Sequence, residues 1–279
     1  MTDHSNVVAS CLINIPVLRK FLRGKTSEFD NQRTITAELS RLARHLSSSL
    51  KSTQRLRTIV MTKCLMSGIS NRNFNNNTQF DCVEFIQSLF EHFWEEQSWD
   101  EDLEEQMFGG LLQERLECNC GNIQKLPIQK LAEVLHLQIR GKTTQNCTDE
   151  FFSTQEVDSR CPVCPSTKRK KIVEIVCSPT TVILHLLRFS YDEKQDKTLK
   201  STCPIFCPTM LTLPNGSTYV LNSVINHIGE NSTSGHYNIV IFDEPFDKFV
   251  LLDDSEIEYN VNIDEDMAQQ SYVVSYTRI

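Results

Sequence analysis

The sequence predicts an α+β fold, in which a helical first third packs against a largely antiparallel sheet. Up to about residue 105, apolar residues recur at helical spacing; beyond it, short runs rich in β-branched and aromatic residues alternate with turn formers. A chain of 279 residues with 39% hydrophobic and 23% charged residues is long and apolar enough to bury a substantial core. These observations predict a globular protein without long disordered parts.

The helical pattern covers two regions. Within residues 7–70, apolar residues recur every three or four positions, as at Ile35, Leu39, Leu42 and Leu46. After a polar loop, the stretch DCVEFIQSLFEHFWEEQ places its apolar residues on one stripe and its acids on another. Its opening Asp81 suits the positive end of a helix dipole. We therefore predict that the first third of the chain is mainly helical.

Strands are predicted from Glu105 onward. The runs that carry the signature are QKLPIQKLAEVLHLQIR, TVILHLLRF, YVLNSVINHIG, HYNIVIF, FVLLDD and SYVVSYTRI.

Charge and cysteine use restrict the partners and the compartment. The chain has 36 acidic and 28 basic residues, for a formal charge of -8, which disfavours nucleic acid and acidic membranes and favours a cationic partner. We find no apolar run of transmembrane length and no secretory pattern in the opening residues. We therefore expect an intracellular protein of the cytoplasm, the nucleus or both, whose 11 cysteines are reduced.

Two cysteine pairs raise the possibility of a metal site. Cys118 and Cys120 lie in ECNCG, and Cys161 and Cys164 lie in RCPVC. Four thiolates on two turns are the usual ligands of structural zinc. The first pair is one residue closer than the usual C-x-x-C spacing, and the alternative is four reduced thiols in or near a core. Zinc is the predicted cofactor.

A histidine and two aspartates suggest acid–base chemistry. His236 precedes an alternating apolar run, and a second run ends on Asp253 and Asp254. An aspartate that holds one imidazole nitrogen fixes the tautomer, so that the other nitrogen can act as a base. The alternative is a structural histidine and a pair of aspartates that begin a turn.

The surroundings of these residues resemble the histidine box of the ubiquitin-specific proteases, which are papain-like cysteine enzymes that cut after the C-terminal tail of ubiquitin. Phe249 stands where that family usually has tryptophan. The positions that match the box are Tyr219, Leu221, Val224, His227, Gly229, Gly235, His236, Tyr237, Asp253 and Asp254.

Three further blocks resemble the family in order and spacing. They are QFDCVEFI, SPTTVILHLLRF and the closing SYVVSYTRI. The resemblance implies that Gln79, Asp81, Glu84, His227 and Tyr237 bind the arginine-rich ubiquitin tail. Helix capping is the alternative for Asp81 and Glu84.

The resemblance covers essentially the whole chain and implies one domain over residues 1–279. Its papain-like fold would have a helical thumb up to about residue 105, zinc-bearing fingers at about 106–210, and an antiparallel palm formed by about 211–279 with parts of the middle segment. Cys118, Cys120, Cys161 and Cys164 fall where the family carries its finger zinc.

The residue at the expected position of the nucleophile differs from the family pattern. Aligning Asn6, Leu12 and Leu18 with the family's cysteine block needs no gap and puts Asp3 at the position of the catalytic cysteine. The family's oxyanion-stabilising asparagine would fall before Met1. Cys11 lies eight residues further on, which is about 12 Å along a helix. Either the chain is a pseudoenzyme, or its true beginning differs and encodes the cysteine.

The leading hypothesis is therefore a protein of this family that recognises ubiquitin or a ubiquitin-like modifier and has lost thiol-dependent cleavage; whether it is an enzyme stays open. In an active form, a cysteine would attack, His236 would be the base, and Asp253, or else Asp254, would orient it. The alternative is a scaffold that binds another protein and not ubiquitin; the short first cysteine pair favours it.

Overall fold

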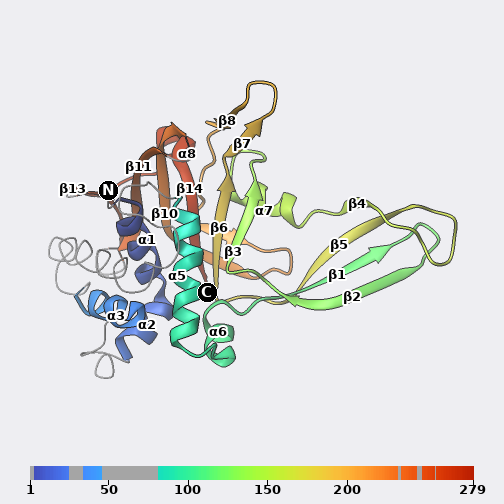
Figure 1. Cartoon of the computed structure of the whole chain (residues 1–279), viewed down its shortest axis with the longest axis horizontal. Helices are drawn as coiled ribbons and strands as arrows, with labels where there is room; N and C mark the ends of the chain where they lie inside the picture. The colour runs from blue at the N-terminus through green and yellow to red at the C-terminus, as the bar shows by residue number, and fades with distance from the viewer. Residues whose placement is uncertain (1–2, 25–33, 46–80, 232–233, 244–246, 255) are drawn as a thin grey trace.

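The computed structural model describes residues 3–24, 34–45, 81–231, 234–243, 247–254 and 256–279. Helices cover one side of a central sheet, and a long, narrow second sheet projects away from it (Figure 1). We call these three parts the thumb, the palm and the fingers. No helix within the described ranges is both long enough and apolar enough to cross a bilayer.

The thumb contains the helices of the first third. They are α1 (Asp3–Asn14), α2 (Pro16–Gly24), α3 (Ile35–His45), α5 (Cys82–Glu96) and α6 (Glu101–Phe108). The helices predicted around Ile35 and after Asp81 are present as α3 and α5, whereas residues 25–33 and 46–70 of the predicted helical region lie outside the described residues. Helix α5 begins after Asp81 because that side chain caps it, accepting a hydrogen bond from Val83 N at 2.7 Å.

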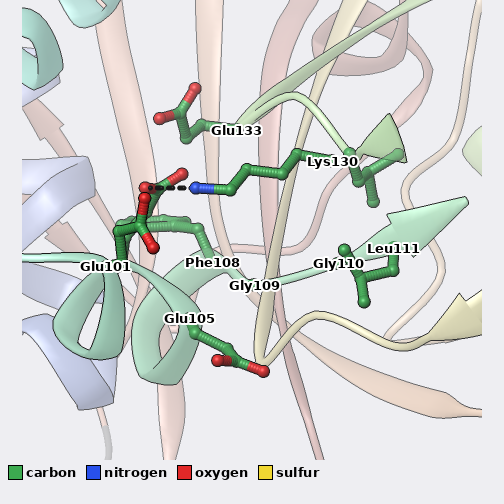
Figure 2. Close-up of a pocket in the computed structure, with 10 residues that line it drawn as sticks. Glu101, Glu105, Phe108, Gly109, Gly110, Leu111, Lys130 and Glu133 are labelled. Atoms are coloured by element: carbon green, nitrogen blue, oxygen red, sulfur yellow. Dashed lines mark hydrogen bonds and ion pairs between the residues drawn. The ribbon is translucent and has the colours of Figure 1, made fainter. Parts of the chain in front are cut away.

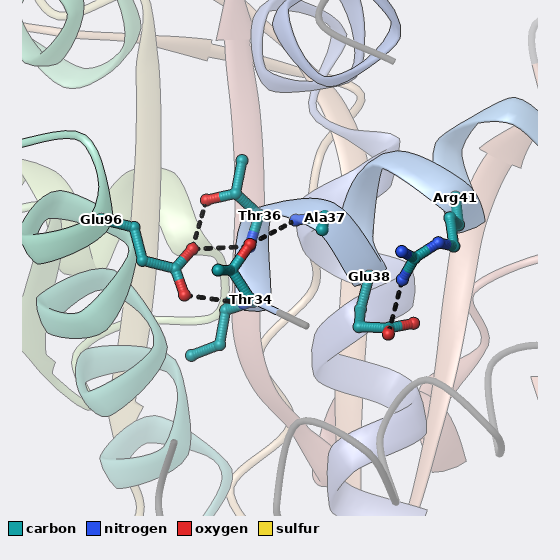
Figure 3. Close-up of polar contacts among 7 residues, drawn as sticks. Thr34, Thr36, Ala37, Glu38, Arg41 and Glu96 are labelled. Carbon is teal, nitrogen blue, oxygen red and sulfur yellow. Dashed lines mark hydrogen bonds and ion pairs between the residues drawn. The ribbon is translucent and has the colours of Figure 1, made fainter. Parts of the chain in front are cut away.

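A glutamate from α5 caps the start of α3 (Figure 3). The carboxylate of Glu96 accepts hydrogen bonds from Ile35 N at 2.7 Å, Thr36 N at 2.8 Å and the Thr36 hydroxyl at 2.6 Å. These amides would otherwise have no partner within α3, and such a cap typically contributes about 1 kcal/mol. The contact fixes the end of α5 against α3.

The palm is one large sheet. Its strands in spatial order are β13 (Glu256–Tyr259), β12 (Lys248–Asp253), β11 (Ser234–Asp243), β10 (Thr218–Asn231), β14 (Ser271–Arg278), β6 (Thr181–Leu187) and β3 (Val134–Gln138), and β9 (Met210–Thr212) also pairs with β10. All neighbours are antiparallel except β3 and β6.

The longest run with a predicted strand signature contains two strands. The run from Gln124 to Arg140 contributes to two strands in two different sheets. Its first part belongs to the fingers; the chain then bends at residues 131–133, and β3 enters the palm beside β6. Periodicity cannot reveal this division, because both halves alternate apolar and polar residues.

Each face of the palm has its own core. On β3, Val134 packs into the cluster that contains α1 and α5, and Leu135 packs into the cluster on the other face. Neighbouring residues on a strand point to opposite faces, which explains the division. Helix α7 (Thr144–Phe151) contributes Cys147 to the second cluster, so α7 and α5 lie on opposite faces of the palm.

The fingers are a four-stranded antiparallel sheet. Its strands in spatial order are β2 (Ile123–Lys130), β1 (Leu111–Glu117), β5 (Lys168–Cys177) and β4 (Gln155–Asp158). At its base, Lys130 Nζ reaches Glu104 of α6 at 3.0 Å, beside a cavity of about 160 Å³ (Figure 2). This ion pair is exposed on its lysine side, so it orients the fingers more than it stabilises them.

A buried arginine joins the palm to a small hairpin, β7 (Phe189–Asp192) and β8 (Lys197–Lys200). The Arg188 side chain is 1% exposed and donates to the carbonyl oxygens of Ser201, Cys203, Ala268 and Ser271. These acceptors satisfy the guanidinium without a carboxylate. The hairpin, the short helix α8 (Glu265–Gln270) and the start of β14 are thereby held together.

Candidate functional site

The structure brings His236 and Asp253 together. They lie on the neighbouring strands β11 and β12, and His236 Nε2 is 2.5 Å from Asp253 Oδ1. The two side chains are 31% and 34% exposed, so the pair lies at the surface, at the rim of the palm. With Nε2 bonded to the carboxylate, Nδ1 is the ring nitrogen that would exchange a proton with a nucleophile.

Two asparagines that the sequence analysis missed hold the aspartate. Asn238 Nδ2 donates to Asp253 Oδ2 at 3.1 Å, and Asn226 Nδ2 donates to Asn238 Oδ1 at 2.9 Å. Both asparagines are buried, so their contacts fix the plane of the Asp253 carboxylate against His236. The position of Asn238, directly after the Gly-His-Tyr motif, was the available signal.

Asp254 is placed differently from Asp253. It is exposed, has a left-handed φ of 48°, and begins the turn between β12 and β13. Its carboxylate still lies close to the pair, because the ligand atoms of His236, Asp253 and Asp254 are within 4.8 Å of one another.

Helix α1 runs along β11 and points its first residue toward His236. Its last residue, Asn14, donates from Nδ2 to Asn222 O at 2.8 Å and to Phe242 O at 3.3 Å. From Phe242 back to His236 is about 20 Å along a strand, and from Asn14 back to Asp3 is about 16 Å along a helix. The start of α1 and the histidine thus lie toward the same end of the palm; the side chain of Asp3 is outside the described part.

The two thumb thiols within the described residues, Cys11 and Cys82, are buried structural groups. Cys11 is fully buried, accepts a hydrogen bond from Ser223 Oγ at 3.3 Å, and has a pKa raised by burial. Ser223 lies opposite Ile241, which is five residues or about 16 Å along β11 from His236. Burial likewise raises the pKa of Cys82. Both thiols are protonated at neutral pH and poorly suited to nucleophilic attack.

The expected tail-binding residues lie on the thumb side of the palm. Besides capping α5, the Asp81 carboxylate accepts a hydrogen bond from the Tyr272 hydroxyl at 2.5 Å. Glu84 is exposed on the first turn of α5. Gln79 lies outside the described residues. The two oxygens of the Asp81 carboxylate thus have separate partners, one in the cap of α5 and one on the palm.

His227 and Tyr237 are buried side chains of the palm strands β10 and β11. The His227 ring lies 4.9 Å from the ring of Tyr237 and 5.8 Å from that of Tyr272, and burial lowers the pKa of His227 to about 4. A Cβ on Gly235 would lie 2.6 Å from His227 Nε2, so only glycine fits before His236. This close approach explains the Gly-His-Tyr motif.

Lys200 is another residue that the sequence analysis missed. Its Nζ donates to His227 O at 2.6 Å and Gly229 O at 2.8 Å. These bonds hold the β7–β8 hairpin against β10, the strand that pairs with the His236 strand β11. Partial burial, with Arg188 nearby, lowers the pKa of Lys200 to about 8.

The four predicted cysteine ligands lie together at the tip of the fingers. Cys118 Sγ is 3.5 Å from Cys164 Sγ, Cys120 Sγ is 3.7 Å from Cys161 Sγ, and all four sulfurs lie within 4.8 Å of one another. Tetrahedral zinc with Zn–S bonds of about 2.3 Å would place sulfurs about 3.8 Å apart. The backbone N–H of Val163 also lowers the pKa of Cys161 to about 6, which favours a thiolate. The cluster can hold a metal ion despite its short first spacing.

A thumb, a palm and fingers with a His–Asp pair at the rim define a papain-like protease fold. The chain also matches, over residues 1–276, the family model described as ubiquitin carboxyl-terminal hydrolase. It therefore belongs to the ubiquitin carboxyl-terminal hydrolase family.

Curated relatives share parts of this chain. Ubiquitin carboxyl-terminal hydrolase 35 of Homo sapiens is 39% identical over 82 residues, which cover 28% of this chain and 8% of that protein. Ubiquitin carboxyl-terminal hydrolase 36 of Drosophila pseudoobscura pseudoobscura is 24% identical over 268 residues, which cover 86% of this chain and 25% of that protein. The chain thus spans a quarter or less of the length of these two relatives.

Solved structures share the fold. The SAGA DUB module of Ubp8, Sgf11, Sus1 and Sgf73 bound to monoubiquitin matches with a TM-score of 0.82 and 23% identity, over 100% of this chain and 67% of the matching chain. The same module bound to ubiquitin aldehyde matches with a TM-score of 0.84 and 20% identity, over 100% and 68% of the two chains. The thumb, palm and fingers are those of a ubiquitin-specific protease.

Proposed function

We propose that this domain recognises ubiquitin, or a closely similar modifier, through residues where the thumb meets the palm, and that it does not cleave it. The observation that supports recognition lies at the start of α5, where the Asp81 carboxylate accepts a hydrogen bond from Tyr272 of the palm and Glu84 is exposed on the first turn of the helix. Acidic side chains suit the arginine-rich tail of ubiquitin. The similar SAGA modules are bound to monoubiquitin and ubiquitin aldehyde, which supports the same ligand here.

The proposed loss of cleavage rests on the nucleophile position. The register puts Asp3 at the start of α1, and α1 points that end toward His236. A carboxylate beside the imidazole would form a charge-assisted hydrogen bond and would not act as a thiolate. Were a cysteine present there, His236 would serve as its base and Asp253 would orient His236.

The fingers are proposed to carry one structural zinc ion, held by Cys118, Cys120, Cys161 and Cys164. The ion would hold the two turns at the fingertip together. The scaffold alternative, in which the domain binds no ubiquitin, was favoured only by the short Cys118–Cys120 spacing. Because the four sulfurs nevertheless lie together, that spacing no longer favours it.

Titration of ubiquitin into the purified chain tests recognition. We expect saturable binding, and we expect Glu84→Arg to weaken it by about tenfold, because the change places a cation opposite the arginines of the tail. Glu150→Arg is the matched control, since Glu150 is an exposed glutamate on α7, on the opposite face of the palm. Absence of binding by the unmodified chain would refute the proposal and restore the scaffold alternative.

A further inference from the structure

A groove at the base of the palm lies away from His236. It has a volume of about 490 Å³, within the size range of ligand-binding pockets. Its walls come from the junction of α1 and α2, from β9, from the first parts of β10 and β12, and from the last parts of β11 and β14. Phe242 on its wall is six residues from His236 along β11, which is about 20 Å. We call it the basal groove.

The lining of the basal groove has the composition of a protein interface. Interfaces are enriched in aromatic residues, methionine and arginine and are depleted in lysine, aspartate and glutamate. Among the described residues, the lining includes two phenylalanines, one methionine and two arginines, and it includes no lysine, aspartate or glutamate. The depletion is pronounced for a chain in which 36 of 279 residues are acidic. This composition favours a protein segment as the ligand.

Two phenylalanines and a methionine form the apolar part of the groove. Phe242 and Phe249 are partners across β11 and β12, and their half-buried rings lie 5.4 Å apart. Met210 on β9 is 52% exposed, and the flexible side chain of methionine adapts to ligands of different shape. A hollow with exposed apolar side chains gains free energy when another apolar side chain covers it.

The uncharged polar side chains at the base of the groove have partners within the protein. Asn14 Nδ2 donates to the carbonyl oxygens of Asn222 and Phe242, and Asn222 Nδ2 donates to Thr277 Oγ1 at 2.5 Å. A ligand therefore need not satisfy these amides. The charged side chains decide which polar group the groove prefers.

Arginines from the thumb and from the palm supply this charge. Arg19 of α2 is half-buried, and Arg278 of β14 is exposed. Arg278 Nη1 donates to Ser178 O at 2.7 Å, and a guanidinium has five N–H donors, so Arg278 can also bind a carboxylate. Among the described lining residues, the only negative group is the terminal carboxylate of Ile279. The groove is therefore cationic in a chain whose formal charge is -8, which favours an acidic ligand.

We infer that the basal groove binds a segment of a partner protein in which an acidic side chain neighbours an aromatic or aliphatic one. The apolar side chain packs on Phe249 and Met210, and the carboxylate pairs with Arg278. Along β14, Arg278 is six residues, or about 20 Å, from Tyr272, which bonds the cap residue of α5. The domain can therefore hold this partner and a modifier at the same time.

Peptide selection against the purified chain tests the inference. The probe is a displayed library of random dodecapeptides, and the enriched peptides are then synthesised and titrated. We expect them to carry aspartate or glutamate beside an aromatic or aliphatic residue, and we expect Arg278→Glu and Met210→Asp each to raise their Kd by about tenfold or more. Arg140→Glu is the matched control, because Arg140 is an exposed arginine outside the groove lining and its replacement should leave the Kd unchanged. Both groove residues are exposed, so the variants should fold, and thermal unfolding checks this.

The outcomes are independent of the proposed function. Enriched peptides that are basic, or whose binding is insensitive to Arg278→Glu and Met210→Asp, would overturn the inference. Self-association of the chain that the same two substitutions abolish would show that a second copy fills the groove, which would also overturn it. Both variants should keep the Kd for ubiquitin within about twofold, and absence of ubiquitin binding by the unmodified chain would refute the proposed function alone.

Discussion

The purified domain should contain about one zinc ion per chain, and Cys161→Ser should remove it. Cys161 is buried at the fingertip beside Cys120, and its thiolate is favoured by the amide of Val163. Structural zinc typically contributes about 10–16 kcal/mol of apparent binding free energy at neutral pH, so the tip cannot keep its geometry without the fourth ligand. Metal analysis and limited proteolysis of the fingers measure the effect.

The palm should survive this substitution, because its two cores do not include the fingertip. Cys203→Ser is the control: Cys203 is an exposed thiol outside the cluster, and its loss should leave the zinc content unchanged. A metal-free chain whose fingers resist protease as well with a chelator as with added zinc would contradict the assignment.

The second large effect is a loss of stability in mild acid. Burial lowers the pKa of His185 to about 3 and that of His227 to about 4, so both are neutral in the folded protein. In the unfolded chain each histidine titrates near its ordinary value, so between about pH 6.5 and pH 4 the unfolded state binds more protons and is favoured. Between pH 7 and pH 5 each group should lower the free energy of unfolding by about 2 kcal/mol.

Urea denaturation at pH 7 and pH 5 measures this loss. His185→Gln should remove about half of the two-histidine effect, whatever it costs at pH 7, because glutamine does not titrate. His92→Gln is the control, since His92 is a partly exposed residue of α5. Equal pH dependence in the unmodified chain and His185→Gln would show that buried His185 is not responsible.

Much of the fold could be predicted because its signals are local. The apolar stripe that follows Asp81 specified α5, and the alternating runs around His236 and Asp253 specified strands that the structure pairs. The two cysteine pairs also predicted that their four thiols lie together at the fingertip. Each of these features depends on residue types at short spacing, which a sequence displays directly.

The missed features depend on contacts between distant segments. Asn226 and Asn238 support Asp253 only because β10, β11 and β12 are neighbours in the sheet. Lys200 reaches two carbonyl oxygens 27 and 29 residues away. Such contacts leave no periodic signal, since a buried asparagine or lysine looks like a surface residue in the sequence.

The most direct test of the account is the reaction of ubiquitin carrying a C-terminal thiol-reactive group with the unmodified chain and with Asp3→Cys, followed by intact mass. We expect no adduct for the unmodified chain and a single adduct for Asp3→Cys, because a thiol at the start of α1 would lie toward His236 and next to the bound tail. An adduct with the unmodified chain would show that one of its own thiols reaches the site and would contradict the proposed loss of cleavage. Failure of Asp3→Cys to react while it still binds ubiquitin would contradict the placement of Asp3 at the nucleophile position.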